Sequence, residues 1–203
     1  MDRKELLNVL NLSTFTAFDF ETTGLDPNSD RIIEIAAIRF QDGEIVDRFV
    51  SLVNPEFEIP NLITEITGIS NAMVIKSPKE ADIIDDFLNF LGDSPLVAHN
   101  IRFDQQFLTR LCLKYEKEEN NFKKYDTLQL ARSLLFEQPV FNLTALSDFY
   151  GLSSDNAHRA ESDTENTGLI FLKLIKELAG YPLDFISKVN TLIQGADIPN
   201  SYL

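Results

Sequence analysis

An apolar strand that ends in two acidic residues, TFTAFDFETTG at residues 14–24, constrains the fold of this chain more than any other feature. Side chains alternate along a strand, so Asp19 and Glu21 share one face. The aromatic residues that alternate with them, Phe18 and Phe20, point the other way and must enter a core. Two strand steps separate the Cα atoms of Asp19 and Glu21 by about 6.6 Å, which lets both carboxylates reach one cation. The segment therefore predicts a buried strand with a cation site at its end.

A solvated strand end is the alternative interpretation, and it would suit an isolated Asp-x-Glu pair better. Two features argue against it here: the apolar run before the pair, and Thr22-Thr23-Gly24 after it. Glycine lets the backbone approach a ligand closely. In addition, two buried carboxylates at this spacing cannot both remain charged at neutral pH without a compensating cation. We therefore favour the cation site.

The remaining pattern predicts an α/β fold. Asp42-Gly43 joins two strand-like runs, residues 31–40 and 44–53, and is a strong hairpin signal. A short apolar strand, residues 95–100, then lies among segments of helical periodicity. Strands that first form a hairpin and then alternate with helices indicate a mixed central β-sheet flanked by helices. We expect helices over residues 1–13, from a capping box at 77–80 to Gly92, and over 101–115, 126–135, 142–150 and 159–178.

The chain is expected to form one domain over residues 1–179, followed by a C-terminal helix and tail or linker over residues 180–203. Two connections, residues 54–76 and 114–124, are expected to be loops, the first with one helical turn. The single cysteine, Cys112, excludes an internal disulfide and fits a reducing compartment, so we expect a cytoplasmic location. Because no apolar run approaches membrane-spanning length, we expect no association with membranes.

The net charge of −14 bears on what this chain can bind. Proteins that hold nucleic acid through its phosphates are usually basic, so a chain this acidic should bind nucleic acid weakly by itself. If it acts on a polyanion, it needs metal ions or a partner to offset the electrostatic repulsion.

Polar residues also stand at the end of the short strand PLVAHN, where a core would prefer apolar ones. His99 and Asn100 end this strand, and Asp104 follows in the first turn of the next helix. The helix dipole favours an acidic residue there, which is one explanation of Asp104. However, Asp104 shares the inward stripe of that helix with Leu108 and Leu111, and a metal ligand explains this position better.

The long helix over residues 159–178 carries one charged residue, Asp163, on its inward stripe. His158 lies five residues earlier, and two helical residues at that spacing diverge by about 140°. His158 is therefore expected in the preceding loop, free to swing over the site. A core or surface role is the usual interpretation of one histidine, but both histidines here, His99 and His158, fall in these polar segments. Gly168 predicts close packing of the helix onto another element.

The inward carboxylates cannot be buried together without cations. All-oxygen ligation suits Mg²⁺ or Mn²⁺ better than Zn²⁺. Two such ions, about 3.5–4 Å apart, can hold the attacking and leaving oxygens of a phosphodiester in line. Histidine, which ordinarily titrates near neutrality, is a suitable general base. The carboxylates are Asp19, Glu21, Asp104 and Asp163, and the candidate base is His158.

Three motifs make the chain similar to a known family. DFETTG at 19–24, HNIRFD at 99–104 and HRAESD at 158–163 match, in order and spacing, the motifs of the DEDDh exonucleases, the DnaQ-like group. The resemblance covers roughly residues 12–178 and implies an RNase H-like fold and removal of nucleotides in the 3′→5′ direction. It also implies metal ligation by Asp19, Glu21, Asp104 and Asp163, a general base at His158, and substrate contacts from Thr22, Thr23, Gly24, Leu25, His99 and Phe103.

From this resemblance we expect a metal-dependent exonuclease of the proofreading type, which acts on the 3′ end of single-stranded DNA in replication or repair and releases nucleoside monophosphates. An exoribonuclease or oligonucleotide nuclease with the same site is an alternative, because such a site binds a 3′ end and a backbone. A non-catalytic binding module is disfavoured because all five catalytic positions are filled. The apolar residues of the tail helix fit packing back onto its own domain. The tail also resembles the linker after such domains fused to a polymerase or helicase, so we expect either of these as a fused or docked partner.

Overall fold

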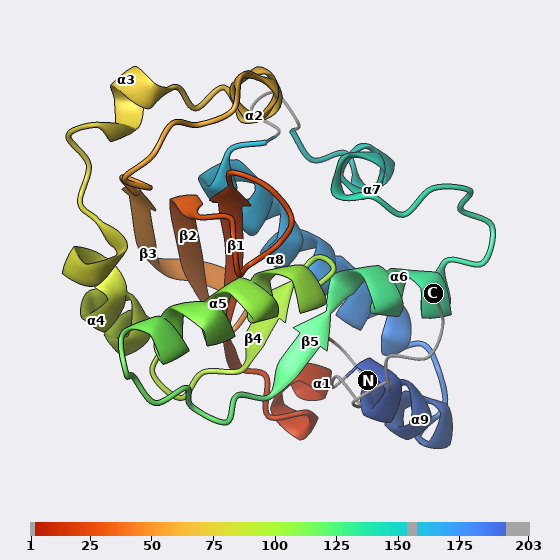
Figure 1. Cartoon of the computed structure of the whole chain (residues 1–203). Coiled ribbons are helices and arrows are strands. Elements are labelled where there is room, and N and C mark those ends of the chain that lie inside the picture. Colours follow the sequence, from red (N-terminus) through yellow and green to blue (C-terminus); the bar gives the residue numbers. More distant parts are fainter. Residues whose placement is uncertain (1–2, 154–157, 194–203) are drawn as a thin grey trace.

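Strand β1, Thr14–Thr22, lies at the centre of a mixed sheet (Figure 1). The structure is a computed structural model of the chain, and it describes residues 3–153 and 158–193. Within these ranges the sheet has four further strands, β2 (Ile32–Gln41), β3 (Glu44–Leu52), β4 (Leu96–Ala98) and β5 (Lys124–Asp126). Their order across the sheet is β3-β2-β1-β4-β5.

The predicted hairpin and the predicted short strand are both present. β2 pairs with β3 in an antiparallel hairpin, and Asp42 and Gly43 both have the positive φ that a tight hairpin turn requires. β1 pairs antiparallel with β2 on one side and parallel with β4 on the other. Since parallel strands end at the same edge of a sheet, the residues that follow β1 and β4 meet at one edge.

Helices cover both faces of the sheet (Figure 1). Every predicted helix is present within a few residues of its expected ends. None of the helices in the described part of the chain is long and apolar enough to cross a membrane. In chain order they are α1 (Arg3–Val9), α2 (Asn61–Thr67), α3 (Asn71–Val74), α4 (Glu80–Leu91), α5 (Arg102–Lys114), α6 (Thr127–Leu134), α7 (Leu143–Tyr150), α8 (Ala160–Leu178) and α9 (Leu183–Ile193).

The side chains of β1 alternate between two cores, as the sequence predicts. Phe15 and Ala17 are buried on the face that α8 covers, together with residues of α1, α6 and α9. Phe18 and Phe20 are buried on the opposite face, against α4 and α5. Asp19 and Glu21, near the end of the strand, remain partly exposed.

Helix α8 packs unusually close to β2. A Cβ atom at Gly168 would lie 2.2 Å from Cε2 of Phe40, so only glycine fits at this position. This contact confirms the close packing that Gly168 predicts. Arg48 of β3 adds ion pairs to Glu165 (2.7 Å) and Glu161 (3.4 Å) on the exposed side of the helix. These contacts fix α8 against the hairpin.

Two connections differ from the sequence prediction. Residues 54–76 contain α2 and α3 rather than one helical turn. The expected solvated loop over residues 114–124 instead buries Phe122 and ends in β5. Tyr125 is the one residue of β5 that favours strands, so its pairing with β4 forms the strand.

The predicted capping box at the start of α4 is wrong in its register. The helix begins at Glu80, not directly after Ser77. The cap is instead made by Asp82, whose carboxylate accepts the backbone N–H of Lys79 at 2.8 Å.

The segment after Gly180 is described in part. Helix α9 packs against α6 and β5, and Ile186 and Val189 are buried in the core that α8 forms. The remainder of the expected tail, residues 194–203, lies outside the described residues.

Candidate active site

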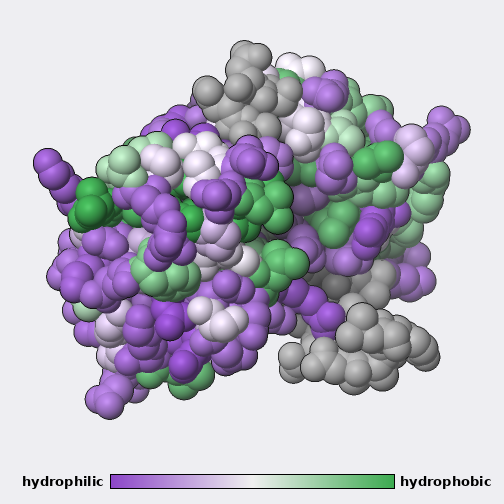
Figure 2. All heavy atoms as spheres, turned by 45° about the horizontal axis from the view of Figure 1, so that its top comes forward, coloured by the Kyte–Doolittle hydropathy of each residue, from purple (hydrophilic) through white to green (hydrophobic). Residues whose placement is uncertain are grey.

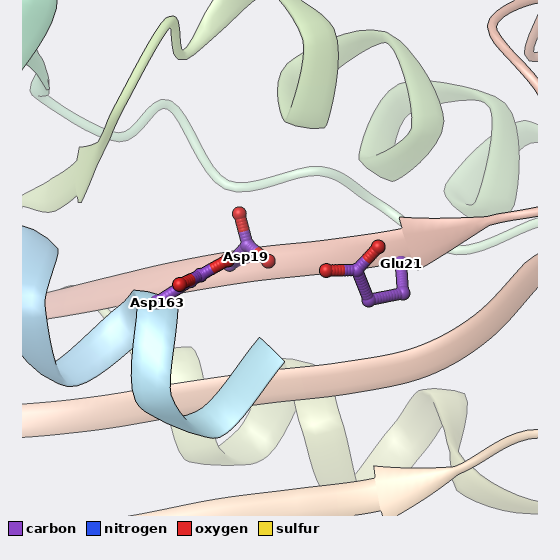
Figure 3. Close-up of side chains that lie close together, drawn as sticks. All are labelled: Asp19, Glu21 and Asp163. Atoms are coloured by element: carbon purple, nitrogen blue, oxygen red, sulfur yellow. The ribbon is translucent and has the colours of Figure 1, made fainter. Parts of the chain in front are cut away.

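Three carboxylates converge at the edge of the sheet where β1 ends (Figure 3). Asp19 and Glu21 project from one face of β1, because they are two residues apart. Asp163 reaches the same point from the first turn of α8. One oxygen of each carboxylate lies within 4.8 Å of an oxygen of both others, and all three side chains are half-buried. The structure thus brings together three of the four predicted ligands.

The fourth predicted ligand, Asp104, comes from helix α5, which packs against the face of β1 that carries Phe18 and Phe20. It belongs to the first turn of α5 and is 2% exposed. Its Oδ1 accepts a hydrogen bond from the backbone N–H of Phe20 at 3.1 Å. Asp104 is therefore fixed against β1 beside Asp19 and Glu21, although it is not within the close three-carboxylate group.

Burial and mutual repulsion make these carboxylates costly to ionise. Burial, followed by the charges of Asp104 and Glu21, raises the pKa of Asp19 well above its ordinary value. Burial, followed by the charge of Asp163, raises the pKa of Glu21 to about 7. Burial raises the pKa of Asp104 to about 8, although its hydrogen bond from Phe20 opposes this shift. The pKa of Asp163 is also raised, again mainly by burial.

The donor set fits a divalent cation that prefers oxygen ligands. Three carboxylates can reach one ion, and Mg²⁺ and Mn²⁺ are bound by such hard oxygen donors. A cation would also offset the repulsion that raises the pKa values of these groups. The residues present therefore fit a metal site.

His158 lies in the turn before α8, as the sequence predicts. It is exposed and has a positive φ of 64°, which is uncommon for a residue with a side chain. Its backbone N–H donates a hydrogen bond to Oδ2 of Asp163 at 3.1 Å. The turn therefore holds one oxygen of Asp163 and places the imidazole of His158 outside the helix.

Two residues that the sequence analysis missed complete the surroundings. Glu34 of β2 is 1% exposed and lies directly opposite Glu21 in the sheet. It accepts hydrogen bonds from Arg159, at 3.1 Å from Nε and 2.5 Å from Nη2, and from the backbone N–H of Ala160 at 2.9 Å. A single acidic residue inside the apolar run IIEIAAIRF was the signal that could have identified Glu34.

The predicted substrate-binding loop after β1 is held by its own side chains. Thr23 Oγ1 accepts the backbone N–H of Arg31 at 3.0 Å and donates to Asp30 at 3.3 Å. A Cβ atom on Gly24 would lie 2.5 Å from Oδ2 of Asp30, so Asp30 itself accounts for this glycine. Thr22 and Thr23 are buried, whereas Leu25 is 82% exposed. Of these residues, Leu25 presents its side chain to solvent.

The other predicted substrate-binding residues follow β4. His99 is largely buried, and its Nδ1 lies 2.9 Å from Oγ1 of Thr127 at the start of α6. Burial lowers the pKa of His99 below its ordinary value. Phe103 packs on Phe107 with ring centroids 5.1 Å apart. These contacts attach His99 to α6 and Phe103 to the α5 core.

The sequence model of a protein family described as "Exonuclease" matches residues 16–171 of this chain. DNA polymerase III PolC-type from Oceanobacillus iheyensis is 41% identical over 165 residues, which are 81% of this chain and 12% of that protein. The protein of the same name from Bacillus subtilis is 37% identical over 185 residues, which are 90% of this chain and 13% of that protein. The chain thus spans 12–13% of the length of these curated relatives.

Solved structures of exonucleases are similar to this chain in fold. Exonuclease X, in complex with 5′ overhanging duplex DNA, matches with a TM-score of 0.67 and 26% identity over 87% of this chain and 99% of that chain. A structure of exonuclease I matches with a TM-score of 0.74 and 21% identity over 88% of this chain and 43% of that chain. The RNase H-like fold predicted from the sequence is confirmed.

Proposed function

This chain belongs to the exonuclease family, and from that premise we propose that it removes nucleotides from the 3′ end of single-stranded DNA in a metal-dependent reaction. The observation that carries the proposal is the convergence of Asp19, Glu21 and Asp163, with Asp104 fixed beside them. Such a group is costly to bury unless cations offset its charge. The names of the relatives, DNA polymerase III, support DNA as the substrate, and nucleoside monophosphates are the products of this hydrolysis.

Two Mg²⁺ or Mn²⁺ ions are the proposed cofactors. Asp19, Glu21 and Asp163 would hold them, and Asp104 would contribute from α5. When bound, such ions stabilise the negative charge that develops on the phosphodiester. The chain's own contribution is to present the carboxylates from β1, α5 and α8 in a fixed arrangement.

His158 is the proposed general base. It is exposed and precedes α8, so it can take a proton from water that attacks the phosphodiester, provided that its imidazole is neutral. The terminal nucleotide would lie against the loop after β1 and the residues after β4. The proposed contacts are Thr22, Thr23, Gly24, Leu25, His99 and Phe103.

The relatives also suggest the cellular setting. Because the chain corresponds to a small part of polymerases, we propose that it works fused or docked to a polymerase, with a helicase as the alternative partner, in a cytoplasmic replication or repair assembly. Residues 1–179 would form the exonuclease domain, and residues 180–203 a C-terminal helix and tail or linker. With 18 basic and 32 acidic residues, the chain has few cations with which to hold a polyanion alone. The partner would supply that affinity.

Hydrolysis of end-labelled single strands tests the proposal directly. DNA and RNA of one sequence, each labelled at the 5′ end, are incubated with the chain while Mn²⁺ or Mg²⁺ is titrated. We expect the DNA to shorten progressively from its 3′ end, only when the ion is present. Faster degradation of RNA than of DNA would favour the exoribonuclease alternative, because the 2′-hydroxyl is the group by which such a site distinguishes the two. Absence of hydrolysis of both strands would favour a non-catalytic binding module.

Dependence on a partner is tested by adding excess unlabelled competitor DNA after the labelled strand has bound. We expect the isolated chain to remove few nucleotides per encounter, and its activity to fall as salt rises. Removal of many nucleotides in one encounter would contradict the need for a partner, but not the hydrolytic activity itself.

A further inference from the structure

The start of helix α8 is held by a side chain from another element. Arg159 precedes the helix as its N-cap residue, and its side chain makes no capping hydrogen bond. The first helical N–H, that of Ala160, donates instead to Oε2 of Glu34 on β2, at 2.9 Å. A carboxylate at this position satisfies a free backbone donor and complements the helix dipole. Glu34 therefore caps α8 from the neighbouring strand.

The same carboxylate binds the guanidinium of Arg159 through two nitrogen atoms. This contact is bidentate: Nε of Arg159 donates to Oε2 of Glu34 at 3.1 Å, and Nη2 donates to Oε1 at 2.5 Å. The Glu34 side chain is 1% exposed, whereas that of Arg159 is 42% exposed. Bidentate pairs of this kind fix orientation as well as distance. The two residues thus fix the helix start in both position and direction.

This anchor connects the two elements that carry the carboxylate cluster. Glu34 is the cross-strand partner of Glu21, and Asp163 lies three residues beyond Ala160, a rise of about 4.5 Å along α8. A shift or tilt at the start of α8 would therefore move Asp163 relative to Asp19 and Glu21. The turn before α8 would move with it.

We propose that Glu34 and Arg159 are positioning residues, which set the separation between Asp163 and the β1 carboxylates and thereby the affinity of the site for divalent ions. Neither residue touches the reacting atoms in this assignment. The consequence for hydrolysis rests on the proposed function, whereas the consequence for ion binding does not. A purely structural ion pair would instead change activity only as far as it changes stability.

The test compares Glu34→Gln, Arg159→Gln and the double variant Glu34→Gln/Arg159→Gln with the unmodified chain. Mn²⁺ affinity is measured by calorimetry, and hydrolysis of a single strand gives kcat and KM. We expect each single variant to bind Mn²⁺ about 10-fold to 100-fold more weakly, as is typical when the partners of metal ligands are removed. The rate constant kcat should fall by a similar factor, with KM changed by less than about 3-fold. Arg159→Lys, which keeps the charge but loses the bidentate contact, should lie between.

Stability is separated from positioning by the double variant. Arg159→Gln leaves Glu34 as a buried, unpaired charge, so it can fail to fold, whereas the double variant removes both charges. We expect the double variant to unfold thermally near the temperature of the unmodified chain while its Mn²⁺ affinity stays low. The matched control is Arg48→Gln, which removes the exposed ion pairs to Glu161 and Glu165 on the same helix. It should change Mn²⁺ affinity by less than about 2-fold.

Recovery of Mn²⁺ affinity together with stability in the double variant would overturn the proposal. So would a loss of affinity in Arg48→Gln as large as that in Glu34→Gln. These readouts need no catalysis: if the unmodified chain hydrolyses no strand but its variants lose Mn²⁺ affinity as described, the proposed function fails and the positioning role stands.

Discussion

The carboxylate of Asp104 accepts a hydrogen bond from the backbone N–H of Phe20, and Phe20 is the residue between Asp19 and Glu21. The bond ties α5 to β1 at the point where the acidic side chains project. Asp104 thus has two separable properties, an acceptor atom for the strand and a negative charge for the site. Asparagine retains the first and removes the second.

We expect Asp104→Asn to abolish most hydrolysis without unfolding the protein. The amide oxygen can still accept the N–H of Phe20, so β1 and α5 stay joined. The lost charge should lower kcat by at least about 100-fold, because an ion would lose a ligand. Hydrolysis at saturating Mg²⁺ measures the loss, and near-normal turnover would refute the assignment of Asp104 to the site.

Without metal, we expect the stability of the chain to fall as pH rises. The pKa of Asp104 is raised by burial to about 8 and that of Glu21 to about 7, above the values of about 4 for unfolded carboxyl groups. Protonated groups therefore favour the folded state, and this contribution is full below about pH 4 and lost as pH rises to about 8. Thermal unfolding in a chelator should show this decline.

Two comparisons check that interpretation. The stability of Asp104→Asn should decline less steeply as pH rises, because this variant lacks one carboxyl group with a raised pKa. Added Mn²⁺ should raise the unfolding temperature more at pH 8 than at pH 5, since ions bind the ionised form. An effect of Mn²⁺ that is equal at both pH values would contradict the ligand role of these carboxylates.

His158→Ala should lower kcat by roughly 100-fold to 10,000-fold, the usual contribution of a general base. His158 is exposed in the turn and does not belong to the close group of possible metal ligands, so Mn²⁺ affinity should change little. A large loss of Mn²⁺ affinity in His158→Ala would show that its role is ligation instead.

Gly168→Ala should destabilise the fold by about 1–3 kcal/mol, because its Cβ atom would overlap the ring of Phe40. Replacement of Phe40 by leucine creates space at this point, so Phe40→Leu/Gly168→Ala should lose less stability than the two single effects add up to. Urea unfolding of the four proteins measures the coupling. Strict additivity would mean that the helix shifts to relieve the contact.

Local signals in the sequence predicted the mixed sheet flanked by helices and the elements on which the acidic side chains lie. The alternation around Asp19 and Glu21, the inward position of Asp104 and the placement of His158 before α8 each depend on spacing within one element. The structure shows these relationships. They could be predicted because the spacing within one element sets them, whatever packs against that element. Even the close approach at Gly168 was visible as a glycine in a long helix.

What the sequence could not supply are relationships between distant elements. Glu34 meets Arg159 only because α8 packs on the hairpin, and no spacing in the chain predicts that pair. β5 is a strand because β4 offers it a partner. Gly24 was expected to face a ligand, but the atom closest to its missing side chain belongs to Asp30, six residues later.

The order in which a ribosome makes this chain decides when the close carboxylate cluster can form. Asp19 and Glu21 emerge early, and Asp163 emerges only after β4, β5 and α7 have been synthesised. A nascent chain that ends before α8 has two carboxylates at the end of β1, and the third is missing. Assembly of the cluster must therefore await the synthesis and docking of the long helix, so no complete three-carboxylate group exists until Asp163 has left the ribosome.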